Sequence, residues 1–193
     1  MRKTAIETFC PTSQAEWRKW LKKNHLSKHS VWLVCYKKKS NKPTIEWSEA
    51  VDEALCFGWI DSKRIPVDEE KFMQFFSKRK PNGTWSKVNK KKIEQLIDKG
   101  LMTEAGLKIV ETAKQDGSWT ILDEVEELRI PKDLAIEFKK RKGSHQFYSS
   151  LSKSVKKAIL QWLVLAKRPE TRQKRIIEIA ELAQQNLKPK HIR

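Results

Sequence analysis

Three short segments near the beginning of the chain are rich in β-branched and aromatic residues, a composition typical of strands. They are SVWLVCYKK at 30–38, WIDSKRIPV at 59–67 and KFMQFFSKR at 71–79, and an acidic turn at 68–70 joins the last two. So few strands can form only a small sheet, which needs helices to bury its face. We therefore expect a small antiparallel sheet flanked by helices.

The segments around these strands carry helix signals. Ser13 is the expected N-cap of a helix in which Glu16 completes a capping box and Trp17, Trp20 and Leu21 share one face. Further helices are expected to begin at Ser48, at Thr84 or Ser86, and at Thr103, and to end at Gly58, Gly100 and Gly117. Their expected inward residues are Val51, Ala54, Leu55, Val88, Ile93, Leu96, Ile97, Leu107 and Val110.

The remainder of the chain has only helical patterns. Residues 132–193 show three apolar stripes at helical spacing, and an acidic stretch precedes them. The fold class is therefore α+β with a helical C-terminal part. We expect an α+β core at 1–120, an acidic connector at 121–131, and a basic helical part at 132–193 that packs on the core as one compact unit.

The charge of the chain points to a negatively charged partner. Its 193 residues contain 41 Lys and Arg against 24 Asp and Glu, a net charge of +17. Residues 129–193 hold seventeen basic and five acidic residues, a net of +12, so the first 128 residues supply only +5. Such a balance attracts polyanions or acidic small molecules, although solubility alone would also explain it.

Cysteine and histidine usage gives no metal or disulfide framework. The three cysteines are widely spaced and form no CxxC pair. His25 and His29 lie four apart in a segment that resembles a loop, without a third ligand nearby. We expect a cytoplasmic protein with buried, inert thiols at Cys35 and Cys56. No signal peptide, membrane-spanning stretch, metal or cofactor is expected.

The segment KRKPNGTWSKVNKKK at 78–92 is the first candidate site, with seven basic residues and no acid. The free N–H groups at the start of a helix attract anions. Lys78, Arg79 and Lys80 would add charge, Ser86 and Asn89 hydrogen bonds, and Trp85 a stacking surface. The alternative is that Thr84 or Ser86 only caps the helix while Trp85 packs into the core.

Two further candidates lie elsewhere in the chain. Arg168, Arg172 and Arg175 are spaced four and three apart, so they would line one helix face with guanidinium groups suited to phosphate or carboxylate. A solvated face, or pairing with the acidic segment 123–127, is the alternative. Asp61 follows a helix end and could act as a base, but pairing with Lys63 or Arg64 is the favoured interpretation.

Several of these stretches together resemble a known family. EALCFGWID, the pattern W-S-x-x-N in GTWSKVN, and AKRPETRQKR are similar to motifs of the YdeI or OmpD-associated (OmdA-like, bacteriocin-protection-like) family of small bacterial proteins, over about residues 9–185. The resemblance implies a cytoplasmic α+β protein without an established reaction. It carries over the matching positions Trp59, Asp61, Trp85, Ser86, Asn89, Arg168 and Arg172.

The sequence therefore favours a non-enzymatic protein that binds a small anionic ligand and is linked to envelope or antimicrobial-peptide stress. One alternative is sequence-independent nucleic-acid binding through the C-terminal basic face. Another is an enzyme of unknown reaction with Asp61 as base. The oligomeric state stays open. The expected ligand-binding residues are Trp59, Asp61, Lys78, Arg79, Lys80, Trp85, Ser86, Asn89, Arg168, Arg172 and Arg175.

Overall fold

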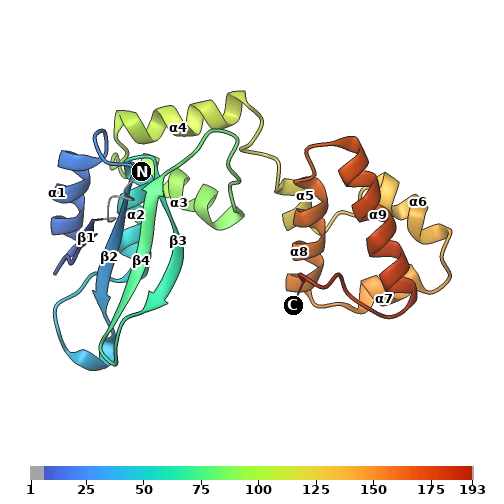
Figure 1. The fold of residues 1–193 in the computed structure, drawn as a ribbon. Coiled ribbons are helices and arrows are strands. Elements are labelled where there is room, and N and C mark those ends of the chain that lie inside the picture. The colour runs from blue at the N-terminus through green and yellow to red at the C-terminus, as the bar shows by residue number, and fades with distance from the viewer. Residues whose placement is uncertain (1–6, 193) are drawn as a thin grey trace, which may run out of the picture. The chain divides into compact units, whose positions relative to one another are not determined.

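The computed structural model describes residues 7–192, which group into two compact units (Figure 1). Unit 1 contains the chain up to residue 84 and residues 88–119, and unit 2 contains residues 85–87 and the chain from residue 120 onward. The segment 85–87 thus belongs by its contacts to unit 2, although its sequence neighbours on both sides belong to unit 1.

Unit 1 is built on a four-stranded sheet in the order β1-β2-β4-β3. β2 (Ser30–Tyr36), β3 (Trp59–Pro66) and β4 (Lys71–Lys78) pair antiparallel, which confirms the three strands expected from sequence. β1 (Thr8–Phe9) adds a short parallel edge beside β2. The sheet is therefore mixed rather than purely antiparallel, because two residues ahead of the first helix pair with a strand that follows it.

Helices α1 (Gln14–Asn24) and α2 (Trp47–Cys56) pack together beside the sheet. Along β2 and β4 every second side chain is buried, as the two-residue period of a half-covered sheet requires. Trp17 of α1 donates its indole N–H to the Ala50 carbonyl of α2 at 3.0 Å, and its ring lies 5.4 Å from that of Phe76 on β4. One indole thus joins both helices to the sheet.

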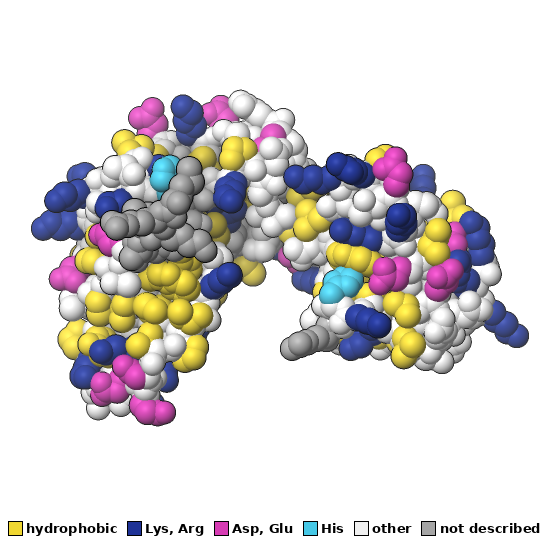
Figure 2. All heavy atoms as spheres, in the orientation of Figure 1, with side chains coloured by type: hydrophobic (Ala, Val, Ile, Leu, Met, Phe, Trp, Pro, Cys, Tyr) yellow, Lys and Arg dark blue, Asp and Glu magenta, His cyan; other side chains and the backbone are white. Residues whose placement is uncertain are grey.

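The opposite face of the sheet is apolar and only half-buried. Trp32, Val34 and Tyr36 on β2 alternate with the buried residues, as do Met73 and Phe75 on β4. Figure 2 shows apolar side chains gathered over this part of unit 1. Arg64 on the exposed edge strand β3 stacks its guanidinium 3.7 Å above the Phe72 ring.

The remaining elements of unit 1 are a short 3₁₀ helix, η1 (Lys38–Ser40), and helices α3 (Lys87–Asp98) and α4 (Glu104–Gln115). The expected caps at Ser13 and Thr103 are confirmed, since each accepts a helix N–H at 3.3 Å. α2 instead begins one residue before Ser48, with Glu46 as its N-cap. The expected inward residues Val88, Ile97 and Leu107 are exposed, whereas Ile93, Leu96 and Val110 are buried.

Unit 2 is helical, as the sequence predicted for the C-terminal part. Its helices are α5 (Asp123–Glu126), α6 (Lys132–Lys139), α7 (Ser144–Ser150), α8 (Lys153–Val164) and α9 (Pro169–Gln184). Buried side chains from all five form one core, including Leu134, Phe138, Tyr148, Leu163 and Ile179. The expected acidic connector thus contains a helical turn, α5, whose Val125 belongs to this core.

Arginine side chains fasten the helices of unit 2. Arg172 on α9 binds Asp133 on α6 through two nitrogens, at 2.7 and 3.1 Å, and also reaches the Leu163 carbonyl at 3.5 Å. Arg175 donates to the Trp162 carbonyl and lies over the indole of the same residue, 4.8 Å from the ring centroid. Both carbonyls belong to the last turn of α8, where the Leu163 carbonyl also accepts the backbone N–H of Ala166 at 3.2 Å.

Replacing Gly106 by alanine should destabilise unit 1 strongly. The first turn of α4 lies so close to the end of α2 that an added Cβ would be 2.3 Å from the Cys56 carbonyl oxygen. The backbone must shift, so we expect a loss of about 1–3 kcal/mol in urea unfolding. Gly100→Ala is the control, because its added Cβ meets nothing within 4 Å and only the positive φ of 64° is strained. Equal losses in the two variants would contradict this close approach.

The Asp133–Arg172 pair should make unit 2 sensitive to acid. The hydrogen bond from Arg172 is the main cause that lowers the pKa of Asp133 below its usual value. The pair therefore stabilises the folded state above the pKa of an unfolded aspartate, about 3.9, and this contribution is lost as the pH falls through the lower folded value.

We expect the wild type to lose more unfolding free energy between pH 7 and pH 3 than Asp133→Asn does, as measured by urea titration of the α6 and α9 amide resonances. Asp133→Asn should still lose some unfolding free energy in acid, because the pKa of Glu126 and Glu137 is lowered as well. Identical losses in the two proteins would show that the pair is not formed in solution.

Candidate functional site

Asp61 lies on β3 at the start of an irregularity in the strand pairing, where the register shifts before Arg64. Its carboxylate oxygen Oδ2 accepts the indole N–H of Trp47 at 3.0 Å and the side-chain amide of Gln74 at 3.1 Å. The expected pairing with Lys63 or Arg64 is therefore wrong. The bulge turns the strand so that Asp61 contacts α2 and β4 side chains, while Arg64 stacks on Phe72.

Arg79 follows β4 and is buried, with one guanidinium nitrogen donating to the Thr84 carbonyl at 3.2 Å. Burial lowers the pKa of Arg79 to about 10, and the nearby charge of Asp61 opposes this shift. Asp61 and Arg79 are thus close enough to interact electrostatically. The guanidinium contacts main chain of its own loop, so it helps to hold the segment 79–84 in shape.

Trp59 and Lys78 face each other across the β3–β4 pair. Trp59 is fully buried, and its ring meets the Trp20 ring edge-on at 5.9 Å. Lys78 donates its ammonium to the Leu26 carbonyl at 2.7 Å. The structure therefore brings Trp59, Asp61, Lys78 and Arg79 to one end of the same strand pair, with the indole of Trp59 inside the core.

The other expected residues lie in different surroundings. In unit 1, Lys80 is exposed and Asn89 is half-buried. In unit 2, Trp85 is buried, Ser86 is half-buried and Arg168 is exposed. Arg172 and Arg175 lie together, but their guanidinium groups bind Asp133 and the end of α8. The expected ligand-binding set is therefore divided between the two units and stays a prediction.

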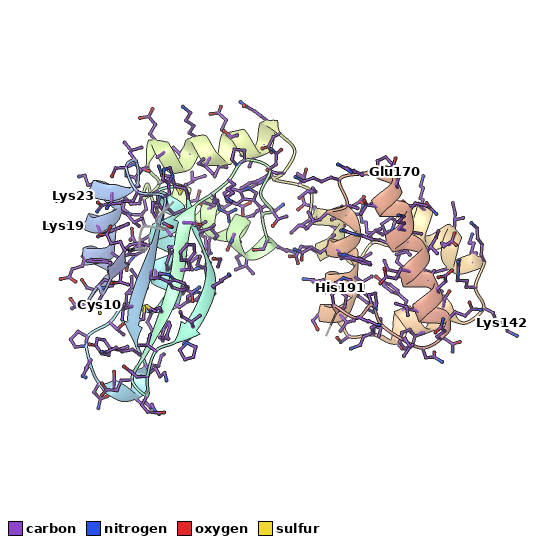
Figure 3. The ribbon with its side chains drawn as sticks, in the orientation of Figure 1. Cys10, Lys19, Lys23, Lys142, Glu170 and His191 are labelled. Carbon is purple, nitrogen blue, oxygen red and sulfur yellow. The ribbon has the colours of Figure 1, made fainter. Side chains whose placement is uncertain are left out.

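A hollow of about 460 Å³ beside β1 and α1 was not found by sequence reasoning. Phe9 and Trp20 form its aromatic floor, with ring centroids 5.8 Å apart in a stacked arrangement. Lys19 and Lys23 extend from successive turns of α1 on its rim, and Figure 3 shows both projecting outward from that helix. The remaining lining residues are Glu7, Glu16 and Asn24.

The charges around this hollow are unevenly neutralised. Glu7 pairs with Lys28 at 2.9 Å, and Glu16 accepts the Thr12 backbone N–H at 2.8 Å, which is the main cause that lowers the Glu16 pKa. Within residues 7–192, neither Lys19 nor Lys23 has a carboxylate within 4.0 Å. The hollow thus combines an aromatic floor with two ammonium groups that have no ion-pair partner, an arrangement suited to a flat anion.

Lysines at i and i+4 around Trp20 were visible in the sequence, since they share one face of the predicted helix. Their significance was missed because Phe9, the other half of the floor, lies beyond a loop and reaches the helix only through the parallel pairing of β1 with β2. That pairing has no short-range sequence pattern.

Thiol and metal chemistry find little support in the described chain. Cys35 and Cys56 are buried, and burial raises the pKa of their thiols to about 12 and about 11. Among residues 7–192, no three His, Cys, Asp or Glu side chains gather as metal ligands. His25 hydrogen bonds with the Leu21 carbonyl at 2.9 Å and lies against Phe57, while His29 is exposed.

No described helix is long and apolar enough to cross a bilayer.

Two family models match the chain. Residues 9–109, almost all of them in unit 1, match a domain of unknown function (DUF8412). Residues 127–186, all in unit 2, match the family described as Bacteriocin-protection, YdeI or OmpD-Associated (OmdA). The resemblance noted from sequence is thus confirmed for the family, but over 127–186 rather than about 9–185. The motif AKRPETRQKR lies inside this match, whereas EALCFGWID and W-S-x-x-N lie inside the DUF8412 match. No curated protein and no solved structure matches the chain.

The first match assigns the larger part of the chain. It spans β2 to β4 and helices α1 to α3, extends into α4, and includes every lining residue of the hollow except Glu7. The second match covers α6 to α9 and includes Arg168, Arg172 and Arg175. The second unit is similar to the OmdA family over 127–186. Because the first match covers more than half of the 193 residues, the protein belongs to the DUF8412 family.

Proposed function

We propose that the protein is a non-enzymatic binding protein for a small anionic ligand, and that the ligand occupies the hollow beside β1 and α1. The observation that carries this proposal is the pair of ammonium groups, Lys19 and Lys23, above the aromatic floor of Phe9 and Trp20. A flat apolar body would lie on the rings while its carboxylate or phosphate contacts the lysines.

The arrangement of this hollow favours binding in three ways. Trp20 is fixed by stacking on Trp17 at 5.1 Å and on Phe9, so little freedom is lost when a ligand packs against it. Both wall carboxylates are already engaged, so they oppose an anion less than free ones would. The net charge of +17 also raises the local concentration of anions.

The family match of unit 2 suggests the setting of this function. A description as bacteriocin protection supports a role in resistance to antimicrobial peptides or envelope stress. Binding of a small anion in unit 1 would then be the sensing or scavenging part of that role in the cytoplasm. Lys78, Arg79, Lys80, Ser86 and Asn89 remain predicted contributors that this hollow does not include.

Neutralising the rim lysines should weaken anion binding. We expect Lys19→Gln and Lys23→Gln each to lose about 1 kcal/mol of affinity for indole-3-acetate, or roughly fivefold in Kd. The measurement is a titration followed at the Trp20 indole resonance. Tryptamine, with the same ring and a positive charge, should bind this hollow more weakly.

Lys22→Gln is the matched control, because Lys22 is an exposed lysine of the same helix that does not line the hollow. It changes the net charge equally. If Lys22→Gln weakened binding as much as Lys19→Gln, the effect would come from overall charge, and the proposed site would be wrong.

The second candidate function is sequence-independent nucleic-acid binding by unit 2. The first turn of α8 favours this candidate, because it contains Lys153 and no acidic residue. The helix dipole would stabilise an acidic residue at this position, not a basic one. Exposed lysines at 139, 142, 167 and 174 have no described carboxylate within 4.0 Å. Such a surface would attract a phosphate backbone.

This candidate predicts a steep salt dependence. If a short duplex DNA contacts four of these lysines, log K should fall against log salt concentration with a slope of about −3.6, and Lys142→Gln combined with Lys153→Gln should reduce the slope by about two. Fluorescence anisotropy of a labelled duplex measures both quantities. Affinity that does not change between 50 and 200 mM salt would remove this candidate.

The enzymatic alternative has the least support. Asp61 accepts two hydrogen bonds on one oxygen, from donors fixed on α2 and β4. No histidine or second carboxylate among the described residues is paired with it, as a general acid–base pair would need. Its contacts suit a positioning role, because Asp61 holds the indole of Trp47 against β3.

A further inference from the structure

An exposed tryptophan stands out on unit 1. Trp17, Trp59 and Trp85 are buried, but the Trp47 side chain at the beginning of α2 is 49% exposed. Tryptophan is enriched at protein interfaces, because its ring is apolar and its N–H can form a hydrogen bond. Among residues 7–192, Trp47 has no ring contact with another aromatic side chain, and about half of its surface is open to solvent.

The Trp47 ring is nevertheless held in place. Its N–H donates to Asp61 Oδ2 at 3.0 Å, and the same oxygen accepts the amide of Gln74 at 3.1 Å. Gln74 is only 3% exposed and lies in the middle of β4. A buried amide thus fixes a carboxylate, which in turn fixes an exposed ring, so a ligand meets a preorganised surface.

The charges beside this ring are mainly negative, in contrast to the protein as a whole. Glu46 and Glu49 flank Trp47 in sequence, and both are exposed. Glu46 pairs with the highly exposed Lys38 at 3.2 Å, a contact of little strength in water, and it forms a capping box with Glu49 in which each carboxylate accepts the backbone N–H of the other residue. Both hydrogen bonds that the described side chains donate to Asp61 are accepted by Oδ2.

Two cations lie near this group and reduce its negative charge. Arg79 interacts electrostatically with Asp61 from within the protein, and Lys92 binds Asp52 at 2.5 Å on the next turn of α2. Arg79 is buried inside the protein, and Lys92 is largely buried against the Asp52 carboxylate. The side open to solvent therefore presents an indole face with carboxylates at its edge.

An aromatic face next to a carboxylate is the usual environment of a bound guanidinium group. The cation lies over the ring, where the π-electrons attract it, and its N–H groups reach the carboxylate. We propose that Trp47 and Asp61 bind the guanidinium of an arginine side chain in a basic peptide. Arginine fits better than lysine because its planar group both stacks and forms directed hydrogen bonds.

The overall charge of +17 does not prevent this. At physiological ionic strength the Debye length is about 8 Å, so charges beyond the immediate surroundings of Trp47 are largely screened. The site lies on α2 and β3, away from Lys19 and Lys23, and does not depend on the proposed anion site. Failure of either proposal would leave the other standing.

The test is a titration of the ¹⁵N-labelled full chain with agmatine and with acetyl-Gly-Arg-Gly-amide in 150 mM salt, followed at the Trp47 indole resonance. We expect saturable shifts with Kd on the order of millimolar. Asp61→Asn keeps an oxygen that can accept from Trp47 and Gln74 but removes the charge, and it should weaken binding at least fivefold. Trp47→Leu lacks this indole, so its titration is followed at the Gln74 side-chain amide, which bonds to Asp61, and the variant should not bind.

Glu69→Gln is the matched control, since it removes the same charge from an exposed carboxylate in the β3–β4 turn. It should leave the Kd unchanged. An unshifted Trp20 resonance in every variant shows that the fold is intact. Equal affinity in wild type and Asp61→Asn, or larger Trp47 shifts with adenosine 5′-monophosphate than with agmatine, would overturn the proposal.

Discussion

The buried indole of Trp17 is the contact on which unit 1 depends. It bonds to the Ala50 carbonyl of α2, packs on Phe76 of the sheet, and stacks on Trp20 of its own helix. Because α1 is held in this orientation, Trp20 reaches Phe9 and the rim lysines point outward. The proposed anion site is thus a consequence of how one aromatic side chain fastens a helix, and its floor is an extension of the core.

Unit 2 uses arginine for the equivalent purpose. The AKRPETRQKR motif looks in sequence like a surface for anions, but Arg172 pairs with Asp133, and both Arg172 and Arg175 donate to carbonyls in the last turn of α8. A guanidinium group can satisfy several acceptors at once, which explains why arginine stands at these positions. Only Arg168 of the three is exposed to solvent.

Local pattern was enough to predict the strands and several caps, because alternation and capping depend on near neighbours. It failed where distant segments decide. Val88 and Leu107 fit a helical stripe yet are exposed, and the parallel strand at Thr8–Phe9 depends on β2. Asp61 was identified as notable, but its partners Trp47 and Gln74 are fourteen and thirteen residues away, beyond any local signal.

The central claim is that a flat anion lies on Phe9 and Trp20 beneath Lys19 and Lys23. Intermolecular NOEs between indole-3-acetate and the labelled full chain test it most directly. The account predicts NOEs from the ligand ring to the Phe9 and Trp20 side chains. NOEs confined to the segment around Trp85 and Asn89, with none to Phe9 or Trp20, would contradict it.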